Sequence, residues 1–225
     1  VTMKRITIAL LATAVGVGLM SSAYAADLIV SEPAPVGVVD VGGNWDGLYV
    51  GVFAGYGSGT VTDDTSTILG PDMSISGWEL GLALGANFTL SEGIVAGVVG
   101  DVAWANIEGG VDPWDGVEYN INWLGSLRGK LGFDGGAFLP YLTAGVAFAN
   151  ADETNHGGSG PNNVTHIGWT VGAGVEFAAT EDLSIDLLYR YSDYGEQDYV
   201  TSGHGTVPLS LTAHTLSVGL NWRFN

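Results

Sequence analysis

The sequence predicts an all-β protein, an eight-stranded antiparallel up-and-down transmembrane β-barrel. Three observations indicate this fold. Apolar and small or polar residues alternate along eight segments, the connections between these segments are short and long in turn, and charged residues make up only 13% of the chain. Because soluble domains carry about 25% charged residues, this composition suits a lipid environment better than water.

The first 25 residues have the features of a secretory signal peptide. Lys4 and Arg5 precede an apolar run over residues 6–20, and Ala23 and Ala25 have the spacing that a signal peptidase accepts. The run is shorter than the ~20 apolar residues of a spanning helix, which disfavours a retained membrane anchor. Residues 26–44 contain prolines and glycines without a clean period, and are predicted to be an extended periplasmic lead-in to a barrel over 45–225.

Eight later segments are long enough to cross a bilayer as tilted strands, which takes ~9 to 11 residues each. They span residues 45–57, 78–90, 94–106, 118–133, 137–150, 165–178, 183–193 and 211–224. No segment with a helical period of comparable strength interrupts them. Tight turns are predicted at 91–93, 134–136 and 179–182, and long loops at 58–77, 107–117, 151–164 and 194–210. Short turns on one rim and long loops on the other describe an up-and-down barrel.

The segment 78–90 (WELGLALGANFTL) indicates which face is turned toward lipid. Its even positions, from Trp78 to Leu90, are apolar, whereas its odd positions are mostly small or polar. A soluble barrel would cover its exterior with charge, which a face of glycine, alanine, serine and threonine does not do. Such a face fits the crowded interior of an eight-stranded barrel. The same alternation places Ile121 and Trp123 outward on the fourth strand.

All four basic residues after the signal peptide fall on strands at the parity of the small residues, and four acidic residues do so too. A lysine or arginine that faces lipid at the midplane costs about 2 to 4 kcal/mol. These side chains are therefore predicted to point into the lumen, where desolvation obliges them to pair. The predicted lumen charge network comprises Glu79, Asp101, Arg128, Lys130, Glu176, Asp186, Arg190 and Arg223.

This network has two interpretations. One is an ion-conducting lumen lined by charge, and the other is a closed salt-bridge core that sets the register and plugs the barrel. The closed core is favoured because eight strands leave little free cross-section.

Aromatic residues collect toward the strand ends at the outward parity, as they do in the two interfacial girdles of a membrane barrel. The β-propensity of aromatic residues explains their presence but not this clustering. The residues are Trp78, Phe88, Trp104, Trp123, Phe133, Phe138, Phe148, Trp169, Phe177, Tyr189, Tyr191, Trp222 and Phe224.

Six stretches also carry a family resemblance, and together they span essentially the whole chain after the signal peptide. They are WDGLYVGVFAGYG (45–57), WLGSLRGKLGF (123–133), PYLTAGVAFA (140–149), GWTVGAGVEF (168–177), LYRYSDYG (188–195) and HTLSVGLNWRFN (214–225). In these pieces and in their order the chain resembles the small outer-membrane β-barrel proteins of alphaproteobacteria, which are opacity-type, porin-like surface antigens.

The resemblance implies an abundant surface protein of the cell outer membrane that engages lipopolysaccharide, is often immunogenic and is not an enzyme. It also implies that Leu220, Trp222 and Phe224 form the signal that the barrel-assembly machinery reads, although Asn225 follows the terminal aromatic residue. Lys130 stands where the family more commonly has arginine, so the charge network is expected to be connected differently from that of its relatives.

The four histidines form no convincing catalytic site. His156 and His204 lie in glycine-rich loops, His166 is predicted to face inward near the mouth, and His214 outward near the upper interface. No serine and histidine share a strand face with an acid at a suitable interval. The sequence therefore predicts no enzymatic activity and no cofactor.

The long loops are acidic. After removal of the signal peptide, four bases remain against 24 acids, a formal charge of 4 − 24 = −20, which argues against nucleic acid as a partner. Solubility accounts for such loops, and a sharper hypothesis is that they share Ca²⁺ or Mg²⁺ with the phosphates of lipopolysaccharide. No loop has the EF-hand spacing, so no dedicated metal site is predicted. The acids are Asp63, Asp64, Asp72, Glu108, Asp112, Asp115, Glu118, Asp152, Glu153, Asp193, Glu196 and Asp198.

The predicted function is structural and interactive. The chain is expected to be a non-enzymatic barrel that supports outer-membrane integrity and presents acidic loops to lipopolysaccharide, neighbouring cells or a host. The rival prediction is a narrow porin-like channel for small solutes. No feature of the sequence indicates an oligomeric state.

Overall fold

The computed structural model describes residues 44–63, 72–91, 93–110, 117–155, 162–201 and 205–224. The predicted signal peptide over 1–25 and the lead-in before residue 44 lie outside these ranges. No helix in the described part of the chain is long and apolar enough to cross a membrane. All regular secondary structure in these ranges is strand.

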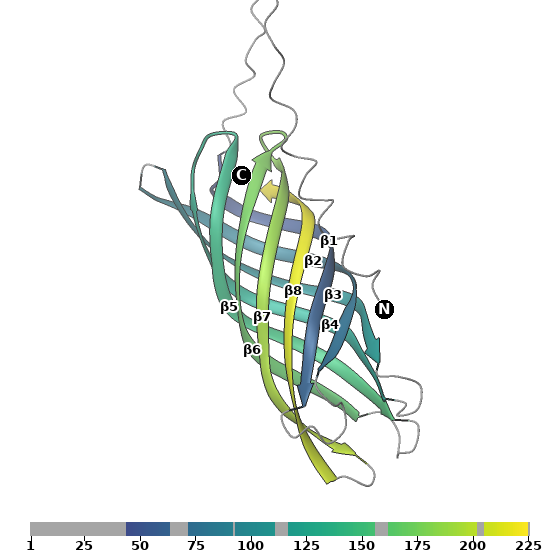
Figure 1. Cartoon of the computed structure of the whole chain (residues 1–225). Helices are drawn as coiled ribbons and strands as arrows, with labels where there is room; N and C mark the ends of the chain where they lie inside the picture. Colours follow the sequence, from purple (N-terminus) through teal and green to yellow (C-terminus); the bar gives the residue numbers. More distant parts are fainter. Residues whose placement is uncertain are drawn as a thin grey trace, which may run out of the picture. The chain divides into compact units, whose positions relative to one another are not determined.

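Eight antiparallel strands form a closed barrel in sequence order (Figure 1). The last strand pairs with the first from Leu48↔Phe224 to Asp63↔Leu209, so the sheet closes on itself. The predicted fold is therefore confirmed. The strands are β1 (Gly47–Asp63), β2 (Met73–Ser91), β3 (Ile94–Gly110), β4 (Val117–Phe133), β5 (Phe138–Asn155), β6 (Asn162–Ala178), β7 (Leu183–Thr201) and β8 (Gly205–Phe224).

The strands are longer than the sequence pattern predicted. They contain between 17 residues, as in β1, and 20 residues, as in β8. The strand ends at the tight turns agree with the prediction to within one or two residues, but much of the predicted long loops is strand. The predicted strand boundaries at the long-loop end of the barrel were wrong, because backbone pairing continues there after the outward apolar residues stop.

The alternation of residue types inverts part-way along each strand. On β2 the odd positions face inward throughout, and outward Leu82 is half exposed. Toward the start of the same strand, however, Met73 and Ile75 are buried inside, while Ser74 faces outward. One part of the barrel is therefore apolar outside, and the other is apolar inside.

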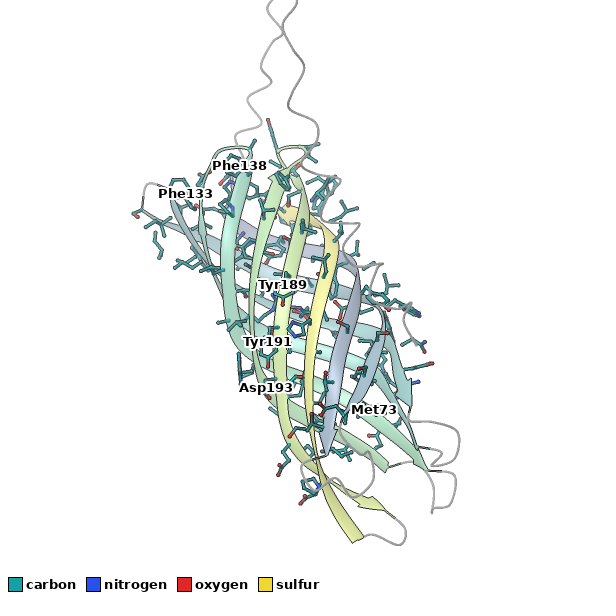
Figure 2. All side chains as sticks on the ribbon, in the orientation of Figure 1. Met73, Phe133, Phe138, Tyr189, Tyr191 and Asp193 are labelled. Atoms are coloured by element: carbon teal, nitrogen blue, oxygen red, sulfur yellow. The ribbon has the colours of Figure 1, made fainter. Side chains whose placement is uncertain are left out.

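Outward aromatic residues mark the level of the inversion. On β2 Trp78 lies ten positions from Phe88, and on β4 Trp123 lies ten positions from Phe133. At about 3.3 Å per residue and a tilt near 40°, ten residues rise roughly 25 Å, the height of the apolar band of a membrane barrel. Figure 2 shows Phe133 at one end of the barrel and Met73 toward the other.

We call the parts of the strands between the two aromatic levels the lipid band. The parts beyond Trp78 and Trp123 we call the outer extension. It comprises residues 57–63, 73–77, 105–110, 117–122, 149–155, 162–166, 192–201 and 205–213.

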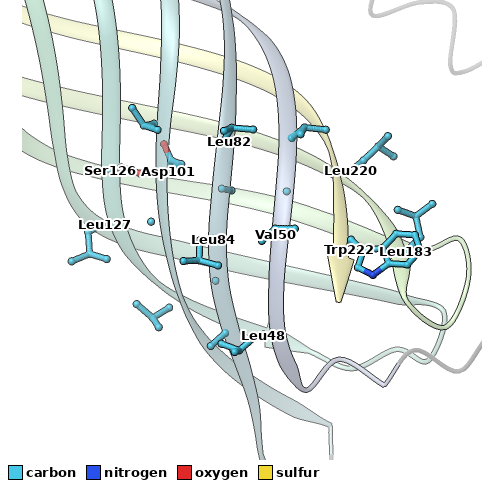
Figure 3. A pocket seen from close by; sticks show the side chains of 18 residues that line it. Leu48, Val50, Leu82, Leu84, Asp101, Ser126, Leu127, Leu183, Leu220 and Trp222 are labelled. Atoms are coloured by element: carbon cyan, nitrogen blue, oxygen red, sulfur yellow. Dashed lines mark hydrogen bonds between the residues drawn. The ribbon is translucent and has the colours of Figure 1, made fainter. Parts of the chain in front are cut away.

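The surface of the lipid band is apolar and grooved. One groove of about 1010 Å³ lies on the outer face of β1, β2 and β3, next to β8. Figure 3 shows the side chains that line it. Leu82, Leu84 and Val50 stand around it, and Gly100 lies among them. Alternation of branched and small residues thus gives a rough apolar surface of the kind that hydrocarbon chains fill.

The outer extension encloses an apolar core that the sequence reasoning did not find. Its outward positions are serine, threonine, asparagine and acids, so this part of the barrel is built like a water-soluble one. The buried core residues are Val61, Met73, Ile75, Ile107, Ile121, Ala149, Ala151, Tyr194, Leu209, Leu211 and Ala213, together with Ala103, Leu124 and Ala147 at the adjoining end of the lipid band.

Ile121 belongs to this core, and its predicted outward position was wrong. The register of β4 with both neighbours shifts between Ile121 and Trp123. Because an irregularity of this kind moves the side chains beyond it to the opposite face, Ile121 is fully buried while Trp123 is 42% exposed. Apolar and polar residues alternate along the sequence without interruption here, so the alternation gives no sign of the register shift.

Inward glycines make room for aromatic rings on the neighbouring strand. Tyr49 of β1 pairs with Gly85 of β2, and Tyr141 of β5 pairs with Gly174 of β6. A Cβ atom on Gly174 would lie 2.5 Å from the Tyr141 hydroxyl oxygen, so the ring occupies the space that a side chain would need. Both tyrosines thereby reach the charged layer of the interior.

Candidate functional site

The charged side chains predicted to face the lumen are all on the inward face of the lipid band. Glu79 lies on β2, Asp101 on β3, Arg128 and Lys130 on β4, Glu176 on β6, Asp186 and Arg190 on β7, and Arg223 on β8. The four basic side chains are almost fully buried. These eight residues form the centre of the candidate site.

One cluster of the network crosses the barrel from β4 to β7. Asp101 accepts hydrogen bonds from Arg128 Nη2 at 2.6 Å and from Arg190 Nη1 at 3.2 Å. Arg190 Nη2 also reaches Glu79 Oε1 at 3.2 Å. Ser126 Oγ completes the shell of Asp101 by donating to Oδ2. Because two arginines share one carboxylate, Asp101 connects opposite walls of the lumen.

A second cluster lies nearer the tight turns. Lys130 Nζ is 2.6 Å from Glu176 Oε2, and Ser184 and Asn221 donate hydrogen bonds to the other oxygen of Glu176. The Lys130 ammonium also lies 4.2 Å from the centre of the Tyr141 ring. Its charge is therefore balanced both by a carboxylate and by an aromatic face.

Among the described residues, two members of the predicted network form no acid–base pair, although pairing of all eight was expected. Asp186 is held by the Tyr141 hydroxyl, which lies 2.7 Å from Oδ1. Arg223 lies near the end of β8, where it donates to the Asn44 carbonyl at 2.9 Å and stacks 4.5 Å from the centre of the Trp45 ring. A phenol from β5 and an indole from the segment before β1 stand in the place of charged partners.

A cavity of about 40 Å³ lies between the two clusters. Arg128, Lys130, Asp186, Arg190 and Tyr141 contribute to its wall. A single water needs at least about 10 to 15 Å³ of such volume, so the cavity has room for only a few waters. Side chains fill the remaining cross-section at this level.

Apolar groups close the interior on both sides of the charged layer. The core of the outer extension lies on one side. On the other side, Trp45 packs with Val95 and Leu139, and all three are buried. Trp45 Nε1 also donates to Asp134 Oδ1 at 3.1 Å, which fixes the ring under the barrel. The interior thus consists of an apolar layer, a charged layer and a second apolar layer.

The sequence reasoning missed both apolar layers. Extending the inward parity of the strands into the predicted loops would have found Met73, Ile75 and Leu209. The sequence pattern predicts a strand that starts at Trp45, whereas β1 begins at Gly47.

The two described histidines have structural partners. His166 is buried, and it makes hydrogen bonds with the backbone of Tyr194 and Gly195. His214 is exposed on the outer face, with Nδ1 2.7 Å from the Tyr189 hydroxyl and its ring 5.0 Å from that of Tyr191. His156 and His204 lie outside the described residues.

The acidic residues of the predicted loops are distributed differently from the expectation. The side chains of Glu108, Asp152, Asp193, Glu196 and Asp198 lie on strands of the outer extension, and Asp72 precedes β2. Asp63, Glu118 and Glu153 are also on strands, whereas Asp64, Asp112 and Asp115 lie outside the described residues. Among the described residues, no group of three or more histidines or acids has the geometry of a metal site.

The residues of the predicted assembly signal all face lipid. Leu220, Trp222 and Phe224 are 47%, 50% and 56% exposed on the outer face of β8. Asn225 lies outside the described residues. Recognition of this strand end by the assembly machinery stays a prediction.

Comparisons with known proteins agree with this architecture. A family model for the outer membrane protein beta-barrel domain matches residues 10–224. The 25 kDa outer-membrane immunogenic protein of Brucella abortus biovar 1 (strain 9-941) is 34% identical over 208 residues, covering 91% of this chain and 92% of that protein. The 22 kDa outer membrane protein of Rhizobium leguminosarum bv. viciae is 31% identical and covers 81% of this chain and 79% of that protein.

Two solved structures show the same fold. The outer membrane protein OprG from Pseudomonas aeruginosa matches with a TM-score of 0.54 and 15% identity, covering 83% of this chain and 100% of that one. Neisserial surface protein A (NspA) matches with a TM-score of 0.51 and 20% identity, covering 79% and 97%. Since the family model and the Brucella relative both match most of the chain, this protein belongs to the outer membrane protein beta-barrel domain family, with its place in the outer membrane.

Proposed function

We propose that this protein is a closed, non-conducting barrel that supports outer-membrane integrity and presents an acidic outer extension at the cell surface. We further assign to it no enzymatic activity. The barrel would hold lipopolysaccharide indirectly, through divalent cations shared between its carboxylates and the phosphates of the lipid.

The layered interior is the observation that carries the proposal. A conducting lumen needs a continuous wet path, but the charged layer leaves a cavity of only about 40 Å³. The core of the outer extension adds fully buried residues such as Ile75, Ile121 and Leu211 above it. Ions would have to cross a layer whose buried side chains are mostly apolar, which is costly.

The distribution of charge supports the cation-dependent contact. All four Lys and Arg residues after Arg5 are buried inside the barrel. The exterior therefore offers no lysine or arginine to a phosphate, while Glu108, Glu196 and Asp198 are exposed on the outer extension. Anionic protein and anionic lipid repel each other unless hard cations, which prefer carboxylate and phosphate oxygens, lie between them.

Planar-bilayer recording tests the closed barrel. The refolded protein is expected to give no stable conductance steps under conditions in which a general diffusion porin gives them. Arg128→Gln and Lys130→Gln are expected to remain silent as well, because the apolar layers are unchanged. Stable steps whose size changes in Arg128→Gln would instead support the narrow channel and refute the proposal.

Chelation tests the contact with lipopolysaccharide. The thermal unfolding temperature is expected to fall after EDTA treatment in membranes that contain lipopolysaccharide, and to stay constant in phospholipid alone. A variant with Glu108→Gln, Glu196→Gln and Asp198→Asn is expected to lose most of this EDTA response. Equal responses in the two membranes, or no response in either, would remove cation bridging from the proposed function.

A further inference from the structure

The barrel is not paired along its full height, because β6 and β7 separate in the outer extension. Their pairing runs from Ala178↔Ser184 to Trp169↔Asp193 and ends there. Both strands continue: β6 reaches back to Asn162 beside β5, and β7 runs on to Thr201 beside β8. Among the described residues, no pair joins 162–168 of β6 to 194–201 of β7.

A specific turn in β7 produces this separation. Gly195 has a φ of +66°, and its N–H donates to Asp193 Oδ1 at 2.9 Å. This is an Asx-type turn, a geometry that aspartate and glycine adopt readily. The register of β7 against β8 shifts at the same place, between Asp193 and Glu196. The separation is therefore encoded in the sequence Asp193-Tyr194-Gly195.

Side chains fill the lower part of the gap. His166 of β6 makes hydrogen bonds with the backbone of Tyr194 and Gly195, and the Tyr194 side chain is buried in the apolar core. Above this contact, β7 continues with only β8 as its described neighbour. Figure 2 shows Tyr189, Tyr191 and Asp193 in succession along β7, and Asp193 is the last residue of β7 that pairs with β6.

The end of the β7–β8 hairpin is thus a two-stranded ribbon. The last pair between β8 and β1 is Leu209↔Asp63, whereas β8 pairs with β7 up to Gly205↔Thr201. Figure 1 shows this hairpin projecting past the ends of the other strands. Two-stranded ribbons are at best marginally stable in water, and a third strand stabilises them.

The two edges of the ribbon differ in their protection. β8 contains Pro208, which pairs with Asp198, and proline lacks the N–H that another strand would use. Residues 194–201 of β7 (YGEQDYVT), which we call the β7 edge, contain neither proline nor lysine. Natural proteins commonly place those residues on edges that must not pair. The β7 edge lacks both, and its own protection is the register shift at its base and the acidic side chains of Glu196 and Asp198, which repel acidic strands but not basic ones.

We propose that the β7 edge is a docking site for an extended peptide segment of another protein that carries basic residues at alternating positions. The segment would add to β7 as a further strand, through backbone hydrogen bonds. Glu196 and Asp198 are exposed on one face of this edge, with Asp193 just below, and they select positive charge. A second copy of this chain fits poorly, because its exterior carries no lysine or arginine and would oppose acid to acid.

This site is independent of whether the barrel conducts. Its test uses the full chain refolded in phosphocholine nanodiscs and a fluorescein-labelled peptide of four Lys-Val repeats. Fluorescence anisotropy is expected to show saturable binding. A Lys-Pro repeat of the same length has the same charge but cannot form a strand, and is expected to bind at least tenfold more weakly.

Paired variants locate the site. Glu196→Gln with Asp198→Asn is expected to weaken the Lys-Val peptide about tenfold, whereas Glu108→Gln with Asp152→Asn, on the outer face of β3 and β5, leaves binding unchanged. Hydrogen exchange at the amides of 194–198 is expected to slow at least tenfold when peptide binds. Equal binding of the Lys-Pro peptide, equal weakening by the two variants, or unchanged exchange at 194–198 would each overturn the proposal.

Discussion

The lipid band and the outer extension are built from the same eight strands but have opposite amphipathicity. On β2, Leu82 faces outward and Glu79 inward in the lipid band, whereas Ser74 faces outward and Ile75 inward in the outer extension. The backbone register runs through the boundary without a break on β1 and β2. The pattern of side chains therefore reports the surroundings of each strand segment, and the hydrogen-bonded ladder continues regardless of them.

This difference changes what stabilises each part. In the lipid band, burial of apolar surface on the outside depends on lipid, and the interior is held by ion pairs around Asp101 and Glu176. In the outer extension, water lies outside and the apolar core supplies the hydrophobic contribution. Mutations of comparable size are expected to act by different mechanisms in the two parts.

The largest effect is expected from breaking the charged layer. Asp101→Ala leaves Arg128 with Ser126 and Arg190 with Glu79, and places two guanidinium groups close together without the carboxylate between them. Removal of one partner from a buried ion pair costs about 3 to 5 kcal/mol. Urea unfolding in phospholipid vesicles would measure the loss in free energy of unfolding.

An exposed acid provides the matched control for Asp101. Glu108→Ala removes a carboxylate from the outer face of the outer extension, where solvent screens it, so a change within about 0.5 kcal/mol is expected. Similar losses for Asp101→Ala and Glu108→Ala would mean that the interior is not the low-dielectric layer that its burial indicates.

A second prediction tests where the inversion lies. Leu82→Lys places an ammonium group on the lipid face of β2, which costs about 2 to 4 kcal/mol near the midplane. Ser76→Lys lies on the same face of the same strand but above Trp78, opposite Glu108 on β3, and is expected to be neutral. The same vesicle unfolding measurement applies to both, and equal costs would contradict the proposed membrane level.

The core of the outer extension offers the complementary measurement. Ile75→Ala removes a fully buried side chain, and the loss in free energy of unfolding is expected to be about 2 to 4 kcal/mol. Unlike the cost of Leu82→Lys, this loss is expected to be the same in short-chain and long-chain phospholipids, because Ile75 does not face lipid. Dependence on bilayer thickness would place Ile75 inside the membrane instead.

The fold could be predicted from the sequence, and so could whether each charged side chain faces the interior of the barrel or the lipid. Alternation at period two is a local signal, so Leu82, Arg128 and Arg190 could be assigned from it. Partner choice is not local: Arg190 meets Asp101 across the barrel, and Arg223 meets Trp45 from the other end of the chain. Such contacts depend on the shear of the closed sheet, which no single strand specifies.

The outer extension was missed for a different reason. Its inward residues in the predicted loops, including Ile75 and Leu209, lie next to serine or proline residues, a composition that also suits loops. Ile121 was assigned to the wrong face because the register shift beside Trp123 leaves no mark in the composition. Tertiary burial made strands of these segments where local propensity was ambiguous.

The smallest change in the free energy of unfolding is expected from glycine substitutions on the inward and outward faces of the lipid band. Gly174→Ala puts a methyl group 2.5 Å from the Tyr141 hydroxyl, so the ring must shift away from Asp186 or the strand must bend, at a cost of about 1 to 3 kcal/mol. Gly100→Ala, on the lipid face, meets no atom closer than 3.8 Å and is expected to be neutral. Tyrosine fluorescence and urea unfolding would measure both variants, and a neutral Gly174→Ala would show that the Tyr141 ring is not fixed by its cross-strand glycine.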